Sequence, residues 1–410
     1  MTVAPISEAP ATKRGERRLL VVLGLVAVLG PASMDIYFAA LPSLTDDFGV
    51  SLSVAQLTVT MFVVGLAFGQ LCAGAISDVL GRRRPLLASI VIYMGATAAC
   101  GLAPTIALLA AGRLLQGFAA AAGIVIGRAV VRDLYEGREG ARFLSRLIIV
   151  YGTSPLIAPI VGGQLLAFGS WRLLFVALVV LATVILIVCL RGLPETLPPH
   201  QRASGSFGET VGAFGTLARD RRLVGFAAAL GCMSAAVIVL ASSLPYVLED
   251  VYDLPPQVFG FVFGVAGAAM VAASQVNVWL VGRVEPRTIL RAALAATVAV
   301  GVVLVASAQL DIGPWPLYLM TVLALPCWAF AMPNAVALGL AGHATRAGSA
   351  SALMGLAQYS GGAAMVPLVG LAGRGSALPM AVAVTGLAVA ALLAVALAGP
   401  QLRAPPPPVA

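Results

Sequence analysis

The chain has 410 residues, of which 60% are hydrophobic and only 10% are charged, and its formal net charge is +8. A soluble domain is roughly 45–50% apolar and about 25% charged, so this chain has too few polar side chains to cover a folded surface in water. The composition excludes a water-soluble globular protein and provides enough apolar residues for about a dozen membrane crossings. Basic residues are expected in the loops of a membrane protein, so the net charge does not predict a nucleic-acid partner.

Apolar runs long enough to cross a membrane occur at twelve places along the chain. The longest linker, residues 191–222, divides them into six and six. The predicted spans are 19–41, 53–76, 85–103, 106–127, 142–167, 172–190, 223–246, 257–281, 288–309, 314–340, 347–372 and 377–398. We therefore predict an all-α polytopic membrane protein with a tail at 1–18, a six-helix bundle at 19–190, the linker at 191–222, a second six-helix bundle at 223–398 and a proline-rich tail at 399–410.

The basic residues predict how the chain is oriented. Of the 25 Lys and Arg residues, 22 lie on one side, in the tails and in alternate segments that consist of a loop and the adjoining span ends; Arg172 and Arg374 lie on the other side, and Arg113 lies well inside a span. Short loops rich in Lys and Arg remain in the cytoplasm. Both termini and the central linker are therefore predicted to be cytoplasmic.

In the first span, Asp35 is the only carboxylate that we place within a helix, in the segment Ser33-Met34-Asp35-x-Tyr37. A buried carboxylate can bind and release a proton in the physiological pH range. That is the chemistry a proton-coupled transporter needs. The alternative interpretation is an interfacial residue that faces the outer headgroups.

The loop after the second span reads Gly74-x-x-x-Asp78-x-x-Gly81-Arg82-Arg83-Arg84. Its glycines allow close packing and a tight turn, and its arginines can bind phospholipid headgroups or pair with loop carboxylates. Anchoring by the positive-inside rule alone is the alternative.

Arg113 is the only basic side chain that we place well inside a span. A charge at the centre of a membrane helix costs at least about 2.5–3.5 kcal/mol, so Arg113 needs a partner, an aqueous cavity or a functional reason. A coupling role and a structural hydrogen-bonding role both satisfy this requirement.

The fifth span concentrates residues that disturb a helix. Pro155 and Pro159 remove backbone hydrogen bonds and kink the helix, while Gly162 and Gly163 let a neighbouring helix approach closely. Helix packing alone could account for this pattern.

Several of these segments resemble motifs of known transporters. The 74–84 loop resembles the G-x-x-x-D-x-x-G-R-R signature of the major facilitator superfamily, and Arg113-x-x-Gln116-Gly117 resembles that family's fourth-helix motif. Ala158-Pro159-x-x-Gly162-Gly163 resembles the G-P-x-x-G-G antiporter motif of its drug exporters, with Ala158 in place of the first glycine. The first span is similar to that of the bicyclomycin and chloramphenicol exporters called the Bcr/CflA group.

The resemblance implies two six-helix bundles around a central cavity that opens alternately to each side. It assigns proton coupling or substrate contact to Asp35, Arg113, Tyr37 and Gln116, and the cytoplasmic gate to Gly74, Asp78, Gly81, Arg82 and Arg83. It makes the helix with Pro155, Ala158, Pro159, Gly162 and Gly163 the bending helix.

We therefore expect a proton-coupled exporter of small amphipathic compounds, such as chloramphenicol-like or bicyclomycin-like drugs, in the bacterial inner membrane. The alternative is a major facilitator transporter that imports or exports a small metabolite. The chain has no P-loop, no C-x-x-C pair and no histidine within a span. We expect no enzymatic activity, no metal and no cofactor, the proton gradient as driving force, and a monomer in the lipid bilayer that binds a small molecule and protons but no nucleic acid.

Overall fold

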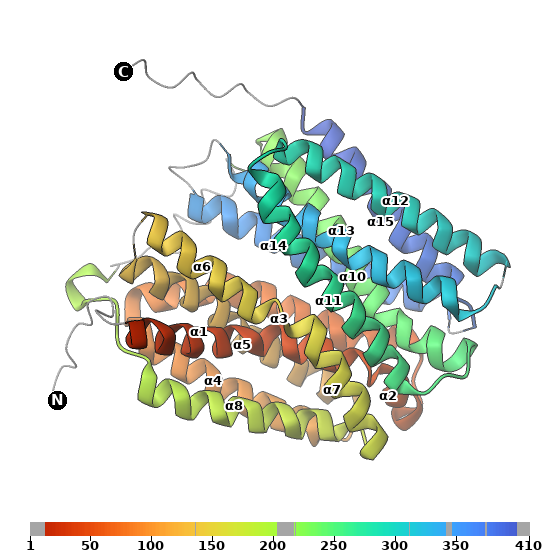
Figure 1. The fold of residues 1–410 in the computed structure, drawn as a ribbon. Coiled ribbons are helices and arrows are strands. Elements are labelled where there is room, and N and C mark those ends of the chain that lie inside the picture. Colours follow the sequence, from red (N-terminus) through yellow and green to blue (C-terminus); the bar gives the residue numbers. More distant parts are fainter. Residues whose placement is uncertain are drawn as a thin grey trace.

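The computed structural model describes residues 13–135, 137–202, 217, 219–310, 312–341, 347–373 and 375–399. Over these residues the secondary structure is helical, and no β-strand occurs among them. The helices form two groups that lie side by side, one from each half of the chain (Figure 1).

The N-terminal half contains the first eight helices. They are α1 (Lys13–Phe38), α2 (Leu41–Phe48), α3 (Leu52–Leu80), α4 (Arg83–Gly101), α5 (Ile106–Leu134), α6 (Gly137–Tyr151), α7 (Ser154–Phe168) and α8 (Arg172–Gly192). The described part of the linker after α8 includes a short 3-10 turn, η1 (Pro199–Gln201).

The C-terminal half begins after that linker. Its helices are α10 (Arg221–Tyr246) with its π-helical extension η2 (Val247–Val251), α11 (Pro256–Val281), α12 (Pro286–Leu310), α13 (Pro314–Leu340), α14 (Ala347–Gly370) and α15 (Leu378–Leu397).

The helices follow the predicted spans with two differences. Within the described residues, ten helices are long and apolar enough to cross a membrane, and α14 and the pair α6 and α7 occupy the two other predicted spans. The fifth span is broken between Tyr151 and Ser154, because Pro155 has no backbone N–H and is accommodated at the start of a new helix. The short helix α2, between the first two spans, was not predicted.

Helix α1 begins at Lys13, so part of the predicted 1–18 tail is helical. Residues 1–12 and 400–410 of the two predicted tails, and residues 203–216 and 218 of the linker, lie outside the described residues.

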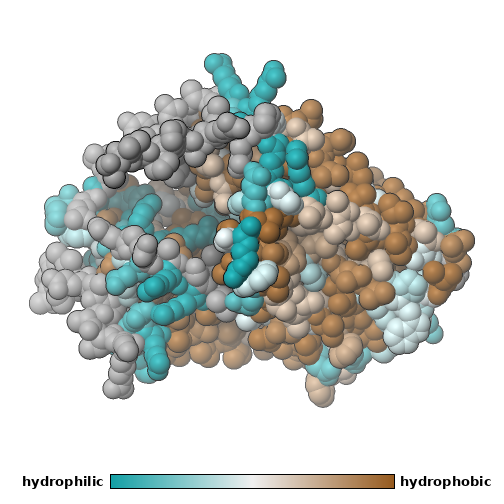
Figure 2. All heavy atoms as spheres, turned by 45° about the horizontal axis from the view of Figure 1, so that its top comes forward, coloured by the Kyte–Doolittle hydropathy of each residue, from teal (hydrophilic) through white to brown (hydrophobic). Residues whose placement is uncertain are grey.

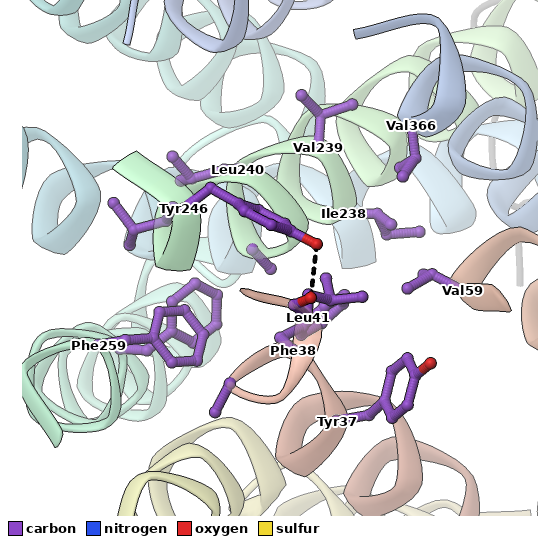
Figure 3. Close-up of a cluster of buried hydrophobic side chains, with 14 of the residues drawn as sticks. Tyr37, Phe38, Leu41, Val59, Ile238, Val239, Leu240, Tyr246, Phe259 and Val366 are labelled. Carbon is purple, nitrogen blue, oxygen red and sulfur yellow. Dashed lines mark hydrogen bonds between the residues drawn. The ribbon is translucent and has the colours of Figure 1, made fainter. Parts of the chain in front are cut away.

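Three hydrophobic cores show how the two halves meet. One core is shared: it combines residues of α1 to α3, such as Tyr37 and Leu41, with residues of α10 and α11, such as Tyr246 and Phe259 (Figure 3). The buried residues of a second core all belong to the N-terminal half, with Tyr359 of α14 packed against them, and those of a third core belong to the C-terminal half apart from Leu217 in the linker. The halves therefore share a core at one end, which we call the joined end, and have separate cores at the other.

Hydrogen bonds also connect the halves at the joined end. Tyr246 donates its hydroxyl proton to the Leu41 carbonyl over 2.7 Å, and Ser53 Oγ donates to the Pro367 carbonyl over 2.9 Å. The opposite end carries the arginine-rich turn between α3 and α4 and the starts of α10 and α12, so we call it the basic end.

The surface fits a lipid environment. Large hydrophobic side chains such as Phe168, Trp315 and Leu397 are exposed, and Figure 2 shows a broad hydrophobic surface with hydrophilic side chains gathered mainly toward one side. An apolar surface of this extent is not found on a soluble monomer, so lipid covers the sides of this bundle.

Candidate functional site

Asp35 lies near the end of α1 and faces the break in the fifth span. Ser154, the first residue of α7, donates its hydroxyl proton to Asp35 Oδ2 over 2.8 Å. Ser154 is buried and Asp35 is partly buried. The neighbouring Met34 packs against both the shared core and the N-terminal core, so Asp35 lies close to where these two cores meet.

Arg113 on α5 is completely buried between two aromatic rings. Its guanidinium carbon lies 4.1 Å from the ring centroid of Tyr37 on α1 and 4.2 Å from that of Phe62 on α3. Arg113 Nη1 donates to the Ser33 carbonyl over 3.2 Å and to Gln116 Oε1 over 2.6 Å. A cation–π contact in a desolvated site is worth about 2 kcal/mol or more, so the two rings compensate part of the cost of burying the Arg113 charge.

The polar groups around Arg113 form a network within the N-terminal half. Gln116 Nε2 donates to Thr97 Oγ1 over 2.9 Å. The hydroxyls of Ser33 and Tyr93 are 2.5 Å apart, as are those of Tyr37 and Thr58. The sequence analysis named Ser33 only as part of the first-span segment and did not identify Thr58, Tyr93 and Thr97; the signal that could have found them is a polar residue inside an otherwise apolar span.

The two intramembrane charges are on different faces of α1. Ser33 and Tyr37 contact Arg113, whereas Asp35 contacts Ser154. Among the ion pairs of the described residues, none joins Asp35 to Arg113. The structure therefore brings Tyr37 and Gln116 together with Arg113 but places Asp35 at a separate position.

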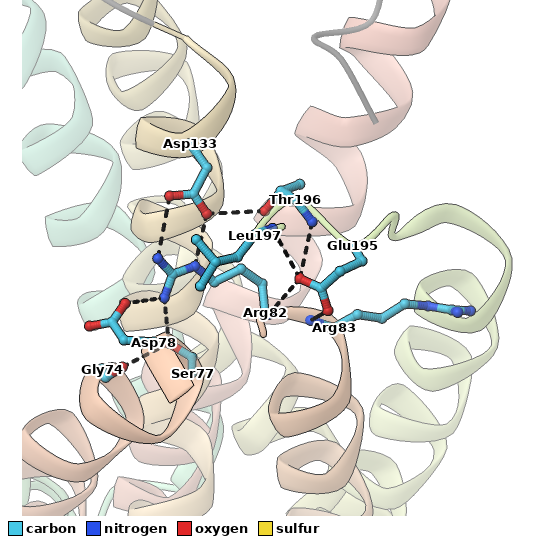
Figure 4. A network of polar contacts seen from close by, with 9 residues as sticks. All are labelled: Gly74, Ser77, Asp78, Arg82, Arg83, Asp133, Glu195, Thr196 and Leu197. Atoms are coloured by element: carbon cyan, nitrogen blue, oxygen red, sulfur yellow. Dashed lines mark hydrogen bonds and ion pairs between the residues drawn. The ribbon is translucent and has the colours of Figure 1, made fainter. Parts of the chain in front are cut away.

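The loop between α3 and α4 is organised around the buried guanidinium of Arg82 (Figure 4). Arg82 Nε donates to Asp133 Oδ2 over 2.8 Å and Nη1 donates to Ser77 Oγ over 2.9 Å, and Arg82 also pairs with Asp78. Burial lowers the pKa of Arg82, but the hydrogen bonds and charges of Asp133 and Asp78 outweigh it and leave the pKa above its ordinary value. The guanidinium is therefore permanently charged.

Glu195, in the linker after α8, connects to the same loop. Its carboxylate accepts hydrogen bonds from the backbone N–H groups of Arg82 and Arg83, over 2.8 and 3.2 Å. Gly81 has a φ of +88°, a backbone conformation that favours glycine, and a Cβ there would lie 2.6 Å from Glu195 Oε2. Gly74 contributes its carbonyl, which accepts from Ser77 Oγ.

Asp133 was missed by sequence analysis, although it accepts from both Arg82 and Thr196. It lies at the end of α5, where sequence spacing gives no sign that the chain returns to the 74–84 loop. In the described residues, all the hydrogen-bond and ion-pair partners of Asp78 and Arg82 belong to the N-terminal half and its linker.

The proline- and glycine-rich helix α7 lies between α1 and α11. A Cβ at Gly162 would lie 2.7 Å from the Ile36 carbonyl oxygen of α1, and one at Gly163 would lie 3.2 Å from the backbone of Gln257 on α11. Ala158 and Pro159 are buried in the same stretch. The predicted close approach is therefore present on two sides of α7.

Helix α11 contributes matching glycines that sequence analysis did not single out. A Cβ at Gly260 would lie 2.6 Å from the Pro159 carbonyl oxygen, and one at Gly267 would lie 2.7 Å from the Pro155 backbone. Gly264 packs against Leu156 and Ile160 between them. The Gly-x-x-x-Gly spacing is a known signal of close helix packing in membranes. We call this contact, residues 155–163 of α7 with residues 257–267 of α11, the glycine seam.

Two helical bundles joined at one end, with polar and charged groups buried inside the membrane region, define a membrane transporter, not an enzyme. The chain belongs to the Major Facilitator Superfamily, whose family model matches residues 23–367. This confirms the predicted all-α polytopic fold and the superfamily named from its motifs.

Curated relatives cover most of the chain. The uncharacterized MFS-type transporter YdgK of Bacillus subtilis is 37% identical over 295 residues, which are 71% of this chain and 73% of that protein. The bicyclomycin resistance protein homolog of Haemophilus influenzae is 31% identical over 304 residues, covering 73% of this chain and 75% of that protein. The multidrug resistance protein MdtL of Escherichia coli is 25% identical over 291 residues, covering 71% and 73%.

Solved structures agree on the fold. A crystal structure of a D-xylose-proton symporter has a TM-score of 0.74 at 14% sequence identity, and the match covers 93% of this chain and 97% of that one. At this identity the likeness concerns the fold alone.

Proposed function

We propose that the protein is a proton-driven exporter of small amphipathic drugs in the bacterial inner membrane, with its basic end toward the cytoplasm. Two relatives, named for bicyclomycin resistance and multidrug resistance, support the substrate class. The arginine-rich loops support the orientation. In this orientation the structure corresponds to a state closed at the outer side, where the two halves share a core.

The observation that carries the proposal is the hydrogen bond from Ser154 to Asp35 at the break in the fifth span. A hydrogen bond to a charged group is worth about 1.5–3 kcal/mol, whereas one between neutral groups is worth about 1 kcal/mol. Protonation of Asp35 therefore weakens the connection between α1 and the start of α7.

This connection leads directly to the interface between the halves. Pro155, the residue after Ser154, packs against Gly267 at one end of the glycine seam. A ligand shifts a conformational equilibrium only if it interacts differently with the two states. A proton on Asp35 meets this condition, because it changes the anchoring of the helix that holds the outer side closed.

The hydrogen bonds around Arg82 in the 74–84 loop support the second half of the proposed transport cycle, in which the basic end closes. The Asp78 side chain is 43% exposed even though it pairs with Arg82. It is therefore accessible to a helix end of the C-terminal half when the basic ends approach each other. Arg82, Asp133 and Glu195 hold the loop in place for that contact.

The test is efflux of chloramphenicol from cells that lack their own exporters, with and without a protonophore. We expect export by the wild type to collapse with the protonophore and in Asp35→Asn, and to persist in Asp47→Asn, which changes a carboxylate that accepts from Trp171 and Arg172 and not from Ser154. Unchanged drug accumulation with a well-expressed wild-type protein would reject drug export in favour of a metabolite substrate.

A further inference from the structure

Arginines of the two halves are buried at the basic end in different surroundings. Arg82 in the N-terminal half is 2% exposed, and its guanidinium contacts the carboxylates of Asp78 and Asp133. Arg287, the second residue of α12, is 8% exposed. Within the described part of the chain, Arg287 has no ion pair.

The hydrogen bonds of Arg287 do not satisfy its guanidinium. Nη2 reaches the Val395 carbonyl at 3.4 Å, and Nε is buried without a hydrogen-bond partner. The charged groups that act on it electrostatically are two cations, Arg222 and Arg291, and one anion, Glu285. A buried cation among further cations is strongly unfavourable unless an anion compensates it.

Three helix ends converge around this side chain. The start of α10 packs against the end of α15, where a Cβ at Gly225 would lie 2.7 Å from Ala398 Cβ. The start of α12 reaches the same turn of α15 through the contact of Arg287 with Val395. The N-terminal ends of α10 and α12 add positive potential, although Asp220 caps α10 by accepting from the Arg222 N–H.

Exposed apolar side chains lie on the outer surface of α10 and α15, between Arg287 and the membrane. Leu397 and Leu393 on α15 and Val224 on α10 are exposed, Leu397 to 81%. A phosphate group at the arginines would thus lie beside a surface suited to acyl chains. Basic pockets between membrane helices on the cytoplasmic side bind anionic lipid headgroups in this manner.

We propose that the helix ends around Arg287, with Arg222 and Arg291, form a binding site for the phosphate group of an anionic phospholipid. The competing explanation is that Arg287 only caps the carbonyl end of α15, as Arg83 caps α8 by donating to the Leu190 carbonyl over 3.0 Å. A pure cap needs no lipid. The two explanations differ in whether a lipid stabilises the protein through Arg287.

The test uses the purified full chain in a neutral detergent and measures lipid adducts by native mass spectrometry and thermal stability. The probes are phosphatidylglycerol, phosphatidylcholine and inorganic phosphate. We expect phosphatidylglycerol to bind and stabilise the wild type, and Arg287→Gln to bind it about tenfold more weakly. Arg283→Gln, an exposed arginine of the same loop that stacks on Trp279, is the matched control and keeps wild-type binding.

Equal phosphatidylglycerol binding by the wild type and Arg287→Gln would overturn the proposal. Equal stabilisation by phosphatidylcholine, or by inorganic phosphate, would overturn the assignment to an anionic lipid. If Arg287→Gln does not fold, the same test is made with Arg291→Gln, which changes an exposed arginine. We expect this variant to bind phosphatidylglycerol about fivefold more weakly. Unchanged phosphatidylglycerol binding by Arg291→Gln would likewise overturn the proposal.

Discussion

At the scale of single residues, replacement of Ser154 tests the proposed proton coupling separately from folding. Ser154→Ala deletes the hydrogen bond to Asp35 and little else. We expect export to fall by about tenfold or more, because a hydrogen bond to a charged group is worth about 1.5–3 kcal/mol, while expression stays normal.

Ser360→Ala is the matched control, since Ser360 Oγ donates only to the Leu356 carbonyl of its own helix. Measurement of initial efflux rates at equal protein levels checks both variants. Equal rates in Ser154→Ala and the wild type would mean that Asp35 does not act through α7.

The Arg82 network predicts unequal roles for its two aspartates. Asp133 is 12% exposed and accepts from Arg82 and Thr196, whereas Asp78 is 43% exposed. We expect Asp133→Asn to lower the free energy of unfolding by about 3 kcal/mol, as for a broken buried pair. Asp78→Asn should cost under about 1 kcal/mol.

Thermal unfolding of the purified variants in detergent measures this difference. The expected order places Asp133→Asn several degrees below Asp78→Asn. If Asp78→Asn were the less stable variant, the loop would be held mainly by the pair between Asp78 and Arg82.

Asp47 on α2 predicts a pH dependence at the joined end. Hydrogen bonds from Trp171 Nε1 and Arg172 Nη1, over 3.0 and 2.9 Å, hold the pKa of the Asp47 carboxyl below its ordinary 3.8. A lowered pKa in the folded state adds stability at pH values above 3.8, and this stability is lost as the pH falls through the folded-state pKa.

The melting temperatures of the wild type and Asp47→Asn should therefore differ at pH 7 and converge toward pH 3. Because Asp47 is well exposed, the difference is small and falls with added salt. A difference that grows on acidification would contradict this assignment.

At the scale of helices, the apolar runs and the basic loops between them predicted the spans. A helix that crosses a lipid bilayer must be long and apolar, whichever helices pack beside it. The break before Pro155 and the short helix α2 could not be read from hydropathy, since both lie inside or beside apolar sequence. The glycine spacing of α11 could have been recognised in the sequence. The partners of Arg113 could not be predicted from the sequence, because Tyr37 and Phe62 come from two other helices.

The glycine seam predicts that a larger side chain on α11 separates it from α7. A Cβ at Gly260 would lie 2.6 Å from the Pro159 carbonyl, and backbone cannot yield as a side chain can. We expect Gly260→Val to destabilise the joined state by about 1–3 kcal/mol and to abolish export. Gly386→Val on α15, where a Cβ has no neighbour within 4 Å, is the control and should export normally.

At the scale of the whole molecule, the three cores bear on the proposed alternation between two states. The buried residues of the N-terminal core and of the C-terminal core each come from one half, whereas the shared core combines buried residues of both halves. Close-packed cores move as units and do not deform continuously. Separation at the joined end must therefore bring the basic ends together.

Distances between spin labels test this reciprocity directly. One pair of labels, at Arg84 and Arg283, reports on the basic end, and another pair, at Leu102 and Leu310, reports on the joined end; all four side chains are exposed. In a variant whose native cysteines are replaced by alanine, Gly260→Val should lengthen the Leu102–Leu310 distance and shorten the Arg84–Arg283 distance. If both distances changed in the same direction, the halves would not pivot as rigid units, and the Asp35–Ser154 connection could not transmit protonation from the seam to the basic end.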